Sequence, residues 1–66
     1  MTNQHFIDQK RDYAHEGRVD AQMNLQTNGY LEFATMEDIK GGTEGIEKPF
    51  LEAYLNGYNS VVNANQ

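Results

Sequence analysis

Acidic side chains recur at intervals of four residues near the start of the chain. This acidic row consists of Asp8, Asp12, Glu16 and Asp20. On a helix, such spacing places neighbouring carboxylates about 6 Å apart along one face. Successive phosphates of a nucleic-acid strand have a similar spacing, so the row would suit a groove shaped for DNA or RNA. The alternative is an ordinary solvated helix face, where exposed charges contribute little.

The same residue types form no catalytic or metal-binding pattern. Acid–base catalysis needs two carboxyl groups in different environments inside a pocket, and 66 residues leave little room for one. His5 and His15 would point in different directions from one helix. Residues 41–45 lack the Lys-Ser or Lys-Thr pair of a phosphate-binding loop, and residues 37–42 lack the alternating ligands of a calcium loop. We therefore expect no enzyme activity, no metal and no cofactor.

Charge is distributed unevenly along the chain. Residues 1–18 contain three acids and three bases, whereas residues 19–66 contain seven acids and two bases, which accounts for the net charge of −5. A nucleic-acid-binding protein needs a basic stripe to displace counterions from phosphates, and the sequence has none. We expect no direct nucleic-acid binding and a protein partner with a basic surface. The alternative is that the charge only maintains solubility.

Helical periodicity is clearest near the end of the chain, over residues 49–63. At about 100° per residue, one face collects Phe50, Leu51, Tyr54, Leu55, Tyr58, Val61 and Val62. Pro49 suits a first helical position. Gly57 would allow the helix to end early and residues 58–62 to form a strand. Because the apolar face keeps its phase across Gly57, we predict one helix that frays near Ala64.

A second helical pattern covers residues 3–27. Its apolar stripe is small at the centre, where Ala14, Gly17 and Ala21 would let another helix approach closely. The alternative at Gly17 is a kink, and we favour close packing. Asn28-Gly29 supplies an end signal. A helix of about 36 Å is too long for a globule of this size to cover, so part of it should protrude or meet another chain.

The middle of the chain carries weaker signals. Residues 30–34 would suit a short strand, but the sequence offers no second strand to pair with it, so we predict a loop or helical turn. Thr35 and Asp38 form a weak capping box, which predicts a short helix at 36–40. Gly41 and Gly42 would end that helix and begin a flexible link. The pattern does not place residues 30–33 relative to the helices.

These patterns predict an all-α fold in a single small domain over residues 1–66. We expect a helical hairpin or three-helix arrangement in which the C-terminal helix packs antiparallel against the N-terminal one. The chain has no Cys and therefore no disulfide. It contains no apolar run of membrane-spanning length and no signal-peptide pattern. We expect a cytoplasmic protein that does not associate with membranes.

The polar side of the C-terminal helix is unusual for a solvated face. Asn56, Asn59 and Asn63 occupy positions where Glu or Lys would be normal, beside Tyr54 and Tyr58. Depletion of charge and enrichment of Tyr are typical of interfaces, although neutral drift would give the same pattern. Two amphipathic helices also enclose little core, so we expect a dimer or a complex. In the dimer, a two-fold axis would bury Tyr54, Tyr58, Val61 and Val62.

In being short, acidic, amide-rich and free of Cys, the chain is similar to the small accessory proteins of bacteriophages, some of which inhibit host or defence enzymes. The sequence and this resemblance predict an anti-defence inhibitor, acting as a nucleic-acid mimic on a basic nucleic-acid-handling or defence protein in the host cytoplasm. The alternative is a structural or assembly subunit that self-associates through its helices. The expected partner-binding residues are Asp8, Asp12, Glu16, Asp20, Glu37, Asp38, Tyr54, Asn56, Tyr58 and Asn59.

Overall fold

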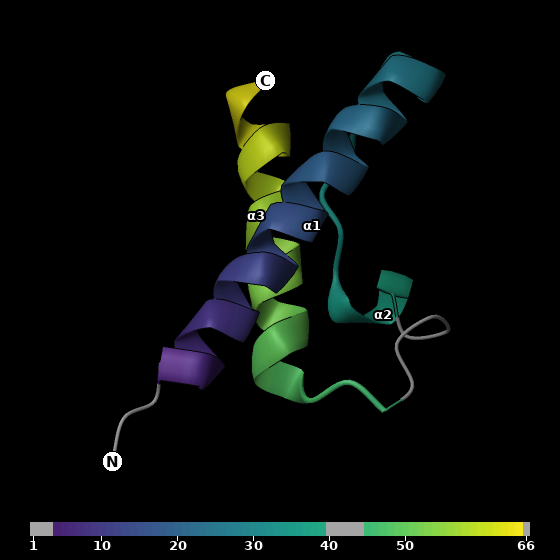
Figure 1. Ribbon diagram of the computed structural model, residues 1–66. Helices are drawn as coiled ribbons and strands as arrows, with labels where there is room; N and C mark the ends of the chain where they lie inside the picture. Colours follow the sequence, from purple (N-terminus) through teal and green to yellow (C-terminus); the bar gives the residue numbers. More distant parts are fainter. Residues whose placement is uncertain (1–3, 40–44, 66) are drawn as a thin grey trace.

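The computed structural model is helical, as predicted. It describes residues 4–39 and 45–65, in which there is no strand. Three helices follow one another along the chain: α1 (Gln4–Asn28), α2 (Met36–Ile39) and α3 (Lys48–Ala64) (Figure 1). The predicted all-α class and the long, short and C-terminal helices are therefore confirmed.

The helix ends follow local signals in the sequence. Gly29 has a positive φ of 80°, and its N–H donates to the Leu25 carbonyl at 2.8 Å, which ends α1 at the predicted place. Pro49 lies in the first turn of α3, where its missing N–H costs nothing. α3 continues through Gly57 to Ala64, as its apolar face predicts. The glycine stop predicted at 41–42 lies outside the described residues.

The two long helices run in the same direction and cross, so the predicted antiparallel packing is wrong (Figure 1). Near their starts, the rings of Phe6 and Phe50 lie 5.3 Å apart between centroids. Farther along both helices, Asn24 Nδ2 donates to the Tyr58 hydroxyl at 3.0 Å. Only a short connection forces neighbouring helices to be antiparallel. Here residues 30–35 run back beside the helices toward the beginning of α3. Because the chain returns in this way before α3 begins, α3 can run in the same direction as α1.

Glycine allows the helix backbones to touch where they cross. A Cβ atom at Gly17 would overlap the Tyr54 carbonyl oxygen and lie 2.9 Å from the Tyr58 nitrogen. A Cβ atom at Gly57 would likewise overlap the Ala14 carbonyl. Close packing at Gly17 is therefore confirmed, and Gly57 makes the matching contact from α3.

The core that surrounds this crossing is thin. Ala21 and Val62 are fully buried, and the other buried apolar side chains are Ala53, Leu55 and Val61. Val61 and Val62 are therefore covered within a single chain, and a second copy is not needed to bury them, contrary to our expectation. At the beginning of the helix pair, the Phe50 ring packs between Phe6 and Tyr13, with a centroid separation of 5.3 Å to Tyr13 as well.

Residues 30–35, which we call the crossover segment, are tied to α3 rather than paired as a strand. The Ala34 N–H donates to Asn59 Oδ1 at 2.8 Å, and Asn59 Nδ2 donates back to the Ala34 carbonyl at 2.9 Å. The Thr35 N–H then donates to Asp38 Oδ2 at 2.7 Å, which is the predicted capping contact of α2. The loop at 30–34 and the short helix after it are confirmed.

The molecule is elongated. Its radius of gyration is 12.4 Å and its extents are 44 × 23 × 16 Å, whereas a compact chain of this length has a radius of gyration of about 10.8 Å. The end of α1 diverges from α3 and projects from the helix pair, as its length predicts (Figure 1). Within the described residues, no helix combines the length and apolar character needed to cross a bilayer.

Candidate functional site

The acidic row lies on α1 but is divided by the packing of the helices. Asp8, Asp12 and Glu16 are exposed, whereas Asp20 is half-buried against α3. The first three residues, which we call the acidic face, therefore present carboxylates to solvent on three successive turns. Asp20 differs from them because each four-residue step turns about 40° around the helix, which brings Asp20 to the side of α1 that meets Tyr54 of α3.

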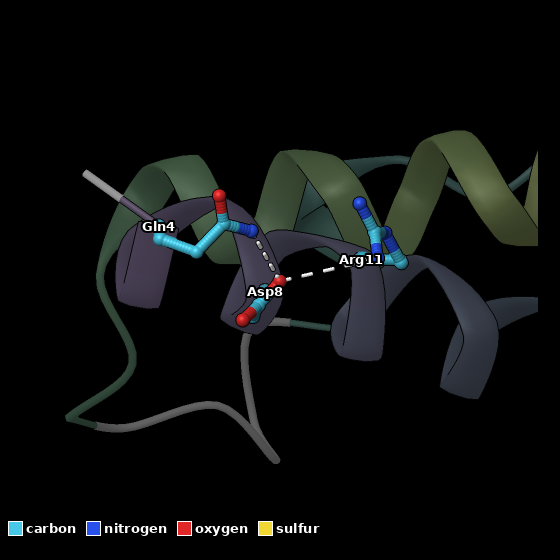
Figure 2. A network of polar contacts seen from close by, with 3 residues as sticks. All are labelled: Gln4, Asp8 and Arg11. Atoms are coloured by element: carbon cyan, nitrogen blue, oxygen red, sulfur yellow. Dashed lines mark hydrogen bonds and ion pairs between the residues drawn. The ribbon is translucent and has the colours of Figure 1, made fainter. Parts of the chain in front are cut away.

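Asp8 takes part in a small polar network at the beginning of α1. Its Oδ1 accepts a hydrogen bond from Gln4 Nε2 at 2.9 Å and lies 3.9 Å from Arg11 Nη1 (Figure 2). The Arg11 and Asp8 side chains are 71% and 51% exposed, so the ion pair contributes little to stability. A cationic group on another protein would therefore displace Arg11 at small cost.

Asp20 and Tyr54 contact each other across the two long helices. The Tyr54 hydroxyl donates to Asp20 Oδ2. Burial of the ring, together with this hydrogen bond, raises the pKa of the Tyr54 phenol above its usual value. Both residues were expected to bind a partner, and in the structure they join α1 to α3.

Of the α3 residues that were predicted to bind a partner, some make contacts within the chain and others are exposed to solvent. The Tyr58 hydroxyl accepts from Asn24 Nδ2, and Asn59 is paired with the backbone of Ala34. Asn56 is exposed. The expected row of amides is therefore not a uniform surface, because Asn59 anchors the crossover segment.

A hollow of about 330 Å³ lies where the crossover segment passes the end of α1. We call it the crossover hollow. Its described lining residues are Asn24, Asn28, Tyr30, Leu31, Glu32, Phe33, Ala34, Asp38 and Tyr58. It brings together two of the predicted residues, Asp38 and Tyr58, which come from α2 and α3. Glu37 lies beside Asp38 on α2 and is exposed, but it does not line the hollow.

Sequence reasoning missed the contribution of the crossover segment to this hollow. Tyr30 and Phe33 remain 63% and 49% exposed, and both line this hollow. The available signal was the pair of aromatic residues on either side of Glu32 in a segment with no strand partner. Among the described residues, no group of three or more His, Cys, Asp and Glu side chains is arranged to hold a metal ion.

Comparisons of the chain with protein-family models, curated proteins and solved structures found no match. The fold and the two surfaces define it as a small all-α protein in which two parallel helices cross through glycine and carry an acidic face at one end and a hollow toward the other.

Proposed function

We propose that this chain is a non-enzymatic module that binds a protein with a basic surface through the acidic face of α1. The observation that supports the proposal is the exposure of Asp8, Asp12 and Glu16 on successive turns of one helix. A helix holds these carboxylates about 6 Å apart without further ordering, so little conformational entropy is lost on binding.

Electrostatic attraction explains what such a face would do. Carboxylates with the spacing of phosphates would steer the chain toward a basic groove and compete there with nucleic acid. The partner would then be a nucleic-acid-handling or defence protein, and the chain would act as its inhibitor. Asp20 is left out of this contact because it is hydrogen-bonded to Tyr54.

A second candidate function is that of an assembly subunit. Its support is the set of large apolar side chains that a single chain leaves exposed, which are Phe6, Ile7, Met23, Tyr30 and Phe33. Self-association through these side chains would bury apolar area and would depend little on salt.

Capture of partners from a bacterial lysate at low and high salt tests the proposal. We expect Asp12→Lys/Glu16→Lys to reduce capture by at least about tenfold, because two attractive charges become repulsive. High salt should weaken capture by the unmodified chain. Glu16→Lys and Glu52→Lys form a matched pair, since both residues are exposed on a helix and each change replaces one negative charge with one positive charge.

The matched pair distinguishes a specific face from net charge. Glu16→Lys should weaken capture and Glu52→Lys should not. If every captured partner bound the double variant as well as it bound the unmodified chain, the proposal would be wrong and the assembly function should replace it.

A further inference from the structure

We propose that the crossover hollow is a binding site for an arginine side chain of a protein partner. The inference rests on the proposed function only for the existence of a protein partner, because the hollow and the acidic face are separate surfaces. Its volume of about 330 Å³ lies at the small end of the range for ligand pockets. That size suits one long side chain better than a larger ligand.

The charge of the lining selects a cation. Glu32 and Asp38 are the charged residues among the described lining residues, and both are acidic. Phosphates and other anions would be repelled, which disfavours a nucleic acid as the occupant. Asn24 Nδ2 is engaged with the Tyr58 hydroxyl, so the Asn24 amide oxygen is the atom left to accept a hydrogen bond.

The aromatic lining favours arginine over lysine. Tyr30, Phe33 and Tyr58 all line the hollow, and the first two are among the most exposed large side chains of the protein. A guanidinium group stacks on aromatic faces, is weakly hydrated and pairs with a carboxylate through two parallel hydrogen bonds. A lysine ammonium is compact and strongly hydrated, so it would gain less from the aromatic rings.

Internal contacts order part of the lining of the hollow before a partner binds. Asp38 Oδ2 accepts from the Thr35 N–H at 2.7 Å and from Thr35 Oγ1 at 3.1 Å, and these two hydrogen bonds orient the carboxylate. Ala34 is tied to Asn59 by two hydrogen bonds. Because these contacts already order the lining, binding an arginine would require little rearrangement.

NMR titration with the peptide acetyl-Gly-Arg-Gly-amide tests the site without a known partner. We expect saturable shifts at the backbone amides of Leu31, Phe33 and Ala34, with a dissociation constant in the millimolar range, about 1–10 mM. The same peptide with citrulline, which is a neutral analogue of arginine, should give no saturable shifts. The lysine peptide should bind at least about threefold more weakly.

Two variants and a matched control identify the binding groups. Glu32→Gln and Tyr30→Ala should each weaken arginine-peptide binding by at least about threefold. Tyr30 and Glu32 are exposed, so neither change should unfold the chain. Glu52→Gln removes the same charge from an exposed position outside the hollow and should bind normally.

Several results would overturn the inference. Equal shifts with arginine and citrulline peptides would exclude recognition of the cation, and equal weakening by Glu32→Gln and Glu52→Gln would exclude the hollow. If the peptide dissociated a self-associated form of the chain, the occupant would be Arg11 or Arg18 of a second copy rather than a different protein. If Glu16→Lys abolished capture of partners from the lysate and Glu32→Gln left it unchanged, the proposal for the acidic face would be supported and the hollow would be refuted as a partner contact.

Discussion

Among the described residues, Tyr54 is the side chain whose pKa the structure clearly shifts. Burial and the hydrogen bond to Asp20 raise its pKa, so the folded chain retains a proton that the unfolded chain loses above about pH 10. The stability gained from this contact is therefore complete below about pH 10 and falls as the pH rises further. At neutral pH the contact joins α1 to α3 through a charge-assisted hydrogen bond.

Tyr54→Phe should lower the free energy of unfolding by about 1 kcal/mol at neutral pH. It should also remove Tyr54's share of the stability loss above about pH 10. Urea denaturation at a series of pH values from neutral to alkaline measures both effects. Tyr30→Phe is the control, because Tyr30 is exposed and should show neither effect. An alkaline decline as steep in Tyr54→Phe as in the unmodified chain would contradict the assignment.

The Asn59 side chain makes the backbone hydrogen bonds that a neighbouring strand would otherwise make to the crossover segment. Its amide group pairs with both the N–H and the carbonyl of Ala34. Asn59→Ala should cost about 1–2 kcal/mol, since two partly buried hydrogen bonds are lost. Hydrogen exchange at the Ala34 amide should become faster. Asn63→Ala is the control on the same helix, because Asn63 is exposed. Unchanged exchange at Ala34 in Asn59→Ala would mean that the segment is held by other contacts.

At the scale of the helices, the crossing depends on the absence of two Cβ atoms. Gly17→Ala and Gly57→Ala would each favour an isolated helix by about 1 kcal/mol. In the folded chain the added methyl group would overlap a backbone carbonyl of the other helix, and backbone cannot rotate away as a side chain can. We expect each variant to be destabilised by about 2 kcal/mol net of the propensity gain.

Thermal unfolding measures this difference. Asn56→Ala is the matched control, because it lies beside Gly57 on an exposed position of α3 and should leave stability unchanged or slightly raised. A glycine variant that melted at a higher temperature than the unmodified chain would show that the helices do not approach so closely.

The helices themselves could be predicted from the sequence, whereas their relative direction could not. Apolar periodicity and local end signals such as Gly29 depend on residues close together in the chain. The small stripe centred on Gly17 permits an approach from either direction. Direction depends instead on contacts between residues far apart in sequence, such as Phe6 with Phe50, which periodicity does not encode.

The candidate site, too, could be predicted from the sequence only in part. The spacing of Asp8, Asp12 and Glu16 correctly placed them on one helix, and their exposure follows from their position opposite the apolar stripe. Tyr54, the partner of Asp20, is 34 residues away, so the hydrogen bond between them could not be predicted. The crossover hollow was missed because residues 30–33 have a strand-like pattern without a strand to pair with, and the contact that anchors the segment comes from Asn59, which is 25 residues from Ala34 in the sequence.

At the scale of the whole molecule, the chain exposes more surface than its mass requires. Its accessible area is 4888 Å², whereas a compact monomer of the same mass exposes about 4,250 Å². In the described part of the chain, the five buried apolar side chains include two alanines and no aromatic residue. A core of this size gives limited stability by itself. Burial of further apolar area against another chain would therefore stabilise the fold substantially.

We therefore expect stability to depend on protein concentration in the absence of any other partner. A chain that dimerises should melt at a higher temperature as its concentration is raised from about 1 µM to about 200 µM, because association stabilises only the folded form. Sedimentation over the same range should show the dimer directly. Because the contact would be apolar, added salt should not dissociate it, in contrast to the complex proposed for the acidic face. A monomer whose melting temperature is high and independent of concentration would show that the crossed helices suffice alone and would remove the main support for the assembly function.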